Sequence, residues 1–108
     1  MRRGEVWWAN LPPPAGRCPV LLLSRNEAYP VRSLITVAPI STRVRNIPVE
    51  IELGAEEGLP KRCAANLDSL VTIPKARLER RIASLSAEKL RAAAAAVHFA
   101  LDLGSEGR

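Results

Sequence analysis

One change of hydrophobic period divides this chain and limits what it can fold into. Through most of its length the apolar residues come in short runs bounded by Pro, Gly, Asn or Ser, the pattern of β-strands. Near the end the spacing becomes four, three and four, in Leu90, Ala94, Val97 and Leu101. That spacing marks one face of an α-helix that packs on the sheet. The sequence therefore predicts antiparallel strands closed by a single C-terminal helix.

The predicted strands are short and rich in Val, Leu, Ile or Trp: Glu5–Asn10, Pro19–Ser24, Leu34–Pro39, Val49–Leu53, Cys63–Asn66, Leu70–Ile73 and Arg81–Ala83. Ser86 is a good N-cap, and Gly104 is a stop signal, so we expect the helix over about residues 87–103. A length of 108 residues suits one domain, residues 1–108. The predicted fold class is α+β, mainly β, as a sheet with one helix or a small half-open barrel.

Charge and composition narrow the classes of function. The chain carries 16 Lys and Arg against 11 Asp and Glu, a formal net charge of +5, which favours a polyanionic partner such as nucleic acid or an acidic protein. No run approaches the ~20 apolar residues of a membrane span, and the N-terminus leads into a strand pattern, so we expect a cytoplasmic protein. Cys18, Cys63 and the one histidine, His98, make no convincing zinc set.

The remaining chemistry is that of arginine, hydroxyl and carboxylate groups. RNA cleavage through the 2′-hydroxyl needs no metal: the protein aligns that hydroxyl with the phosphorus, stabilises charge on the phosphate oxygens and moves protons. The candidates for these roles are Arg17, Arg25, Arg43, Arg45, Ser41, Thr42 and Asp68. The two arginines 43 and 45 lie in an expected exposed loop, Thr42–Pro48, and a second such loop spans Leu11–Arg17.

Three of these candidates also have ordinary structural interpretations. Ser41 and Thr42 directly follow the predicted strand Leu34–Pro39 and its neighbour Ile40, where hydroxyls either face a groove or close an ST-turn. Asp68 is either a catalytic acid or a turn residue. The residues alone do not decide between these alternatives.

Trp7 and Trp8 are neighbours on a predicted strand, so their side chains point to opposite faces. One belongs to the core. The other stacks on an RNA base or covers a subunit interface. We take Trp7 as the candidate RNA-binding residue, together with Arg25, Arg43 and Arg45.

Five segments in this order resemble the MazF/PemK family of toxins, from Arg3 to Leu103: RGEVWWANL, RCPVLLLS, ITVAPIST, LDSLVTIPKARL and the final helix. The resemblance implies a PemK/CcdB-like small twisted β-barrel with a C-terminal helix, assembled as a homodimer. It also implies an endoribonuclease that cuts single-stranded RNA without metal or cofactor. Such toxins are held inactive by an acidic, MazE-like antitoxin. Carried over by position, the family's catalytic hydroxyl falls on Ser41, with Thr42 as its neighbour, and a catalytic acid falls on Asp68.

The family's catalytic arginine stands immediately before the proline that opens the second strand, and here that position is Cys18. A thiol has neither the fixed charge nor the paired donors of a guanidinium, although Arg17 beside it is expected to lower its pKa. Three interpretations stay open. Arg17 takes over the role, the chain is an attenuated or inactive nuclease that still binds RNA and antitoxin, or the cysteine is an engineered or selected change.

Two functions of other classes compete with the nuclease. A CcdB-like toxin binds DNA gyrase without catalysis, but it ends in Trp-Gly-Ile, whereas this chain ends in LDLGSEGR. An inert paralogue that titrates antitoxin or RNA is the third alternative, and Cys18 is the feature that favours it.

Overall fold

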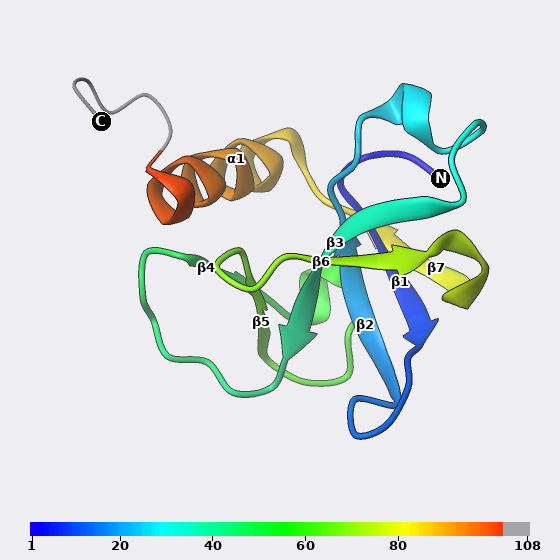
Figure 1. Cartoon of the computed structure of the whole chain (residues 1–108). Helices are drawn as coiled ribbons and strands as arrows, with labels where there is room; N and C mark the ends of the chain where they lie inside the picture. Colours follow the sequence, from blue (N-terminus) through cyan, green and yellow to red (C-terminus); the bar gives the residue numbers. More distant parts are fainter. Residues whose placement is uncertain (103–108) are drawn as a thin grey trace.

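A computed structural model describes residues 1–102 of the chain, and the fold is one curled antiparallel sheet with a helix across one end (Figure 1). The elements in chain order are β1 (Glu5–Asn10), β2 (Arg17–Leu22), β3 (Leu34–Ser41), β4 (Glu50–Leu53), β5 (Cys63–Asn66), β6 (Val71–Pro74), β7 (Leu78–Ser84) and α1 (Ala87–Leu101), with short 3₁₀ turns at Asn26–Ala28, Ala55–Glu57 and Lys75–Arg77. The predicted mainly β architecture with one C-terminal helix is confirmed.

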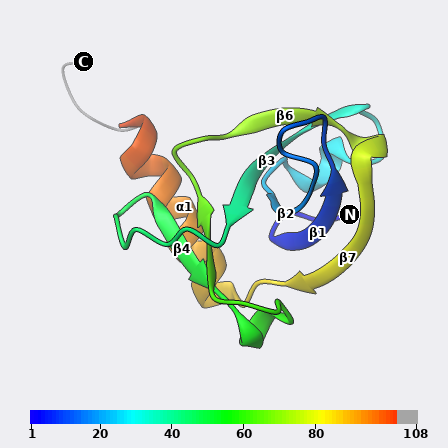
Figure 2. The same cartoon turned by 90° about the horizontal axis from the view of Figure 1, so that it is seen from below.

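The strands pair in the order β4-β5-β3-β2-β1-β7, and β6 pairs with β3. Seen from below, β6, β3, β2, β1 and β7 curl around a common centre, as a half-open barrel does (Figure 2). The long strand β3 holds two parts of the sheet together. Its first half pairs with β6, residues 37–39 pair with β2, and its end turns away to pair with β5 through Ile40↔Ala65 and Ser41↔Ala64.

That turn changes one prediction. Ser41 does not follow the third strand but is its last residue, because its pairing with Ala64 extends the strand beyond Pro39. Only Thr42 begins the loop. Main-chain pairing therefore places Ser41 at the edge where β3 meets β5.

Two groups of buried apolar side chains form the core. The inner cluster fills the curl of the barrel and includes Val20, Leu22, Ile35, Val37 and Ile73. The helix-side cluster lies between the sheet and α1: Val6, Leu21, Ala38, Ile40, Ile51, Leu53, Leu59, Cys63, Ala65, Leu67, Ala93 and Ala96.

The helix begins as predicted, and its predicted apolar face is confirmed only in part: Leu90 and Val97 are half-buried, and Val97 packs against the helix-side cluster. The Ser86 side chain accepts a hydrogen bond from the Lys89 amide (3.1 Å), as an N-cap does. Ala93 and Ala96 are its buried residues, whereas Ala94 is exposed and Leu101 is 54% exposed.

The end of the helix also differs from the prediction. The helix stops at Leu101, where Asp102 adopts a left-handed conformation (φ 53°) and its amide donates to the carbonyls of His98 and Phe99. The predicted stop at Gly104 lies outside the described residues. No helix in residues 1–102 has the length and apolar character needed to cross a membrane.

Candidate nucleic-acid interface

Ser41 and Thr42 line a small surface cavity of about 100 Å³ where β3 meets β5. We call it the hydroxyl cavity. Its walls come from four segments that are far apart in the sequence: Trp8 from β1, Pro19 from β2, Ile40, Ser41 and Thr42 from β3 and its loop, and Leu59, Pro60, Lys61 and Cys63 from the approach to β5. Two hydroxyl-bearing residues, a tryptophan and a lysine are thus among the residues that border one mainly apolar concave surface.

The Ser41 hydroxyl has a local structural partner as well. Its Oγ accepts a hydrogen bond from the Arg43 amide (3.0 Å), which closes the turn that leads into the loop. The ST-turn interpretation is therefore confirmed. It does not exclude the chemical one, because a hydroxyl that accepts a bond still has its own O–H to donate.

Strand pairing separates the two tryptophans. Trp8 lies opposite Pro19, and Arg17, two residues before Pro19, shares that face of the sheet. The Arg17 guanidinium carbon lies 4.2 Å from the centre of the Trp8 ring, and Arg17 Nε also donates to Glu79 Oε1 at 2.8 Å. Arg17 and Trp8 therefore form a cation–π pair beside the hydroxyl cavity.

Trp7 points to the other face. It packs against the inner cluster, and its Nε1 donates to Glu5 Oε1 at 2.9 Å. Burial opposes ionisation of Glu5, but the hydrogen bonds from Trp7 and from the Arg2 amide outweigh it and lower the pKa of this carboxyl. Trp7 thus has a structural role in the described chain. The structure places Trp8, not Trp7, beside the candidate hydroxyls.

Cys18 belongs with Trp7 rather than with Trp8. It lies opposite Ala9 in the β1–β2 pairing and packs, half-buried, against the inner cluster. Burial raises the pKa of its thiol. The expectation that Arg17 lowers this pKa is wrong, because the guanidinium is stacked on Trp8 and paired with Glu79. A neutral thiol at this position is neither a nucleophile nor a cation.

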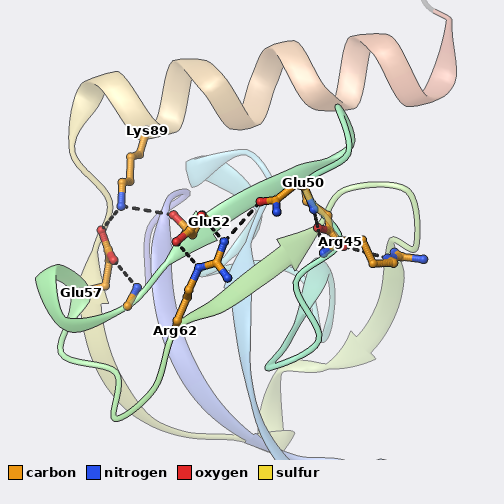
Figure 3. A network of polar contacts seen from close by, with 8 residues as sticks. Arg45, Glu50, Glu52, Glu57, Arg62 and Lys89 are labelled. Carbon is orange, nitrogen blue, oxygen red and sulfur yellow. Dashed lines mark hydrogen bonds and ion pairs between the residues drawn. The ribbon is translucent and has the colours of Figure 1, made fainter.

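The loop that follows β3 is held by a carboxylate on β4. The Glu50 side chain, only 4% exposed, accepts hydrogen bonds from the Arg45 amide (2.8 Å), Arg45 Nε (2.9 Å) and the Asn46 amide (3.1 Å). Farther along, Arg62 donates to both Glu52 and Asn46 (Figure 3). Arg45 is therefore committed to shaping the loop. Arg43 is exposed, and its guanidinium makes no ion pair with any of residues 1–102.

Replacing Glu50 by Gln is expected to destabilise the protein at neutral pH by about 1–3 kcal/mol, because a mostly buried carboxylate that accepts three hydrogen bonds is replaced by a neutral amide. Burial opposes ionisation of Glu50, yet the bonds from Arg45 and Asn46 hold its pKa below the ordinary 4.5. A lowered pKa means that the ionised group stabilises the folded state above pH 4.5, and that this contribution disappears as the pH falls through the folded pKa. Urea unfolding from pH 3 to 7 should show that loss in the wild type and a flatter profile in the variant.

Glu52→Gln is the matched control for this measurement. Glu52 lies two residues away on the same strand, its side chain is 52% exposed, and its partner Arg62 is exposed too. Solvent weakens such pairs, so the control should lose less stability than Glu50→Gln. Equal losses in the two variants would contradict a special role for Glu50.

Of the candidates named from the sequence, only Ser41 and Thr42 line the hydroxyl cavity, and Asp68 and Arg25 lie in other parts of the fold. Asp68 lies in the turn after β5, where its amide donates to Asn66 Oδ1 at 2.9 Å, the arrangement of an Asx turn. Ser41 pairs near the other end of β5, with Ala64. Arg25 lines a different and larger groove, of about 680 Å³, between α1 and the sheet.

Sequence reasoning missed two residues of the cavity, Trp8 and Lys61. The register of the β1–β2 hairpin is the signal that selects Trp8. Trp8 shares a face with Arg17 and Pro19 because it pairs with Pro19. Nothing local marks Lys61, because its position follows from the pairing of β3 with β5. Within residues 1–102, no three His, Cys, Asp or Glu side chains gather as a metal site requires.

Comparisons with known proteins agree on one family. Residues 2–101 match the family model described as PemK-like, MazF-like toxin of type II toxin–antitoxin system. A curated relative, probable endoribonuclease MazF5 of Mycobacterium tuberculosis, is 38% identical over 101 residues, which cover 93% of this chain and 92% of the relative.

Solved structures show the same relationship. Mycobacterium tuberculosis toxin MazF-mt6 superposes with a TM-score of 0.86 at 35% identity, over 94% of this chain and 99% of that one. MazF in a MazE–MazF crystal structure from Deinococcus radiodurans gives a TM-score of 0.82 at 25% identity, over 96% and 98% of the two chains. The similarity therefore extends over the whole of the described fold.

Proposed function

This chain belongs to the PemK-like, MazF-like family of toxins of type II toxin–antitoxin systems, and we propose on that basis that it is an endoribonuclease that cuts single-stranded RNA in the cytoplasm. The observation that carries the proposal is the hydroxyl cavity, where Ser41, Thr42, Trp8 and Lys61 come together on a basic protein. A base and its phosphate find stacking, donor and cationic groups there.

The proposed reaction is an internal transesterification that requires no metal or cofactor. The 2′-oxygen of the RNA forms a bond to phosphorus and loses its proton to solvent, while the bond from phosphorus to the 5′-oxygen breaks and that oxygen gains a proton. The products are a 2′,3′-cyclic phosphate and a 5′-hydroxyl. Ser41 and Thr42 donate to phosphate oxygens as negative charge develops on them, and Arg43 binds a flanking phosphate. Asp68 and Arg25 have no part in this step.

We further propose a homodimer and an acidic antitoxin as partners. Beside the groove between α1 and the sheet, the helix exposes Ala92, Ala95 and Phe99, an apolar surface suited to a second copy of the chain. An acidic antitoxin segment complements the net charge of +5, and the Deinococcus relative is described in complex with MazE.

Cleavage in the presence of a chelator tests the function. We expect the protein, incubated with a long unstructured RNA and EDTA, to produce discrete cuts with cyclic phosphate ends, mapped by primer extension. Intact RNA at high protein concentration would contradict the nuclease. If an acidic antitoxin still bound, the inert paralogue would then be the better description of this chain.

A further inference from the structure

The position of Cys18 leaves an electrostatic problem. Attack of the 2′-oxygen adds negative charge to the phosphate, and a nearby cation normally stabilises that charge. Cys18 occupies the position where the family resemblance implies an arginine, but its half-buried thiol has a raised pKa and carries no positive charge. Another group has to supply the cation if this chain cleaves RNA.

Arg17 is the nearest cation in the sequence, and its charge is already engaged. Its guanidinium is stacked over Trp8 and paired with Glu79 at 2.8 Å. The carboxylate offsets part of the positive charge, although both side chains are partly exposed to solvent. To serve the phosphate, Arg17 would have to leave both partners, so it suits a role in holding the Trp8 ring.

Lys61 lies where the cation is needed. Lys61 is one of the residues that line the hydroxyl cavity, together with Ser41 and Thr42. The placement follows from strand pairing: because Ser41 lies opposite Ala64 in an antiparallel pair, the chain just before β5 runs back past the residues that follow β3. Lys61 is exposed, and it forms no ion pair with any of residues 1–102.

The neighbouring residue provides a contrast. Arg62 donates to both carboxylate oxygens of Glu52, at 2.5 and 3.1 Å, and reaches Asn46 Oδ1 at 3.3 Å (Figure 3). Arg62 does not line the hydroxyl cavity. Of these two adjacent cations, one is committed to the loop network and the other lines the cavity without a carboxylate partner.

We infer that Lys61 is the catalytic cation of this chain. Its ammonium group contacts a non-bridging oxygen of the scissile phosphate and supplies the positive charge that the Cys18 thiol lacks. The inference rests on the proposed ribonuclease function. It adds to that function one residue, Lys61, from the segment that leads into β5. A flexible lysine stem reaches the phosphate as a point charge, without the paired geometry of a guanidinium.

The test compares Lys61→Met, Lys61→Arg and the control Arg62→Met, which removes the same charge one residue away. Cleavage of a short RNA is measured in EDTA, and thermal unfolding checks that each variant is folded. We expect Lys61→Met to lose about 100- to 1000-fold in kcat. Lys61→Arg should keep activity within about tenfold, and Arg62→Met should lose far less than Lys61→Met.

A second measurement separates failure of this inference from failure of the proposed function. Binding of an oligonucleotide made with 2′-deoxyribose, which lacks the attacking hydroxyl, is followed by anisotropy as salt is varied. The association constant falls as salt rises, so the slope of its logarithm against the logarithm of the salt concentration is negative. In Lys61→Met, loss of one phosphate contact should make this slope less steep by about 0.7.

The outcomes are then distinct. If the wild type cleaves RNA and Lys61→Met cleaves equally well, the inference is overturned and the nuclease stands. If the wild type does not cleave, the proposed function fails. In that case an unchanged salt slope in Lys61→Met would also contradict a phosphate contact by Lys61. A less steep slope would show that Lys61 binds a phosphate without taking part in cleavage.

Discussion

Replacing Ser41 by Ala and Thr42 by Val together is expected to lower kcat for RNA cleavage by about 100- to 1000-fold, with little change in folding stability. Both side chains are exposed and line the hydroxyl cavity, so their loss leaves no buried group unsatisfied. The Arg43 amide, which donates to Ser41 Oγ, is at an exposed site where water can replace the hydroxyl. Single-turnover cleavage with saturating protein measures the chemical step without a contribution from binding.

Two companion variants sharpen this measurement. In Ser41→Ala alone the remaining Thr42 hydroxyl should preserve part of the activity, because it lines the same cavity. Ser24→Ala is the control for loss of a hydroxyl that accepts a main-chain hydrogen bond, since Ser24 Oγ accepts from the Thr36 amide at 2.8 Å but does not line the hydroxyl cavity. Wild-type rates in the double variant would show that the hydroxyls take no part in cleavage.

Trp8→Ala is expected to weaken binding of a single-stranded oligonucleotide by about 5- to 150-fold, which corresponds to the roughly 1–3 kcal/mol that stacking of one base on an aromatic ring contributes. The Trp8 ring lines the hydroxyl cavity and carries the Arg17 guanidinium on its face. The substitution removes both the stacking surface and the group that holds Arg17 in place. Anisotropy with an uncleavable 2′-deoxy oligonucleotide gives the affinity directly.

Trp7→Ala is the natural comparison, because it removes the same side chain one residue earlier. Trp7 packs against the inner cluster and donates to the buried Glu5, so its loss should appear in unfolding, at about 3 kcal/mol, rather than in binding. Trp8→Phe should retain much of the affinity, since a phenyl ring still stacks. If Trp7→Ala and Trp8→Ala weakened binding alike, the assignment of faces to the two rings would be wrong.

Local sequence was a good guide to the elements of this fold. The strands Glu5–Asn10 and Cys63–Asn66 were predicted with the bounds that the structure shows. Both are apolar runs closed by an asparagine, so composition and termination agree. Prediction was weaker where pairing extends a strand beyond its apolar run. β3 continues to Ser41 and β7 spans Leu78–Ser84 because partner strands supply hydrogen bonds to polar residues there.

The candidate site was predicted only in part. Ser41 and Thr42 were found because they end an apolar strand, and Arg17 because it adjoins the unusual Cys18. Trp7 was predicted in place of Trp8. Adjacent residues of a strand point to opposite faces, but which of them faces the site is decided only when the strand pairs with its neighbour. Lys61 gave no signal at all. Its link to Ser41 depends on contacts between segments about twenty residues apart, which no local pattern records.

The sequence by itself determined the class of fold, the basic charge and the family, because hydrophobic period, composition and motif order are properties of neighbouring residues. Tertiary structure decided which side chains share a surface. The turn of β3 from β2 toward β5 brings Lys61 to Ser41, and the β1–β2 register turns Trp8 and Arg17 to that side while Cys18 packs inward. These are long-range pairings, and a shift of one residue in register would turn every side chain of a strand to the opposite face.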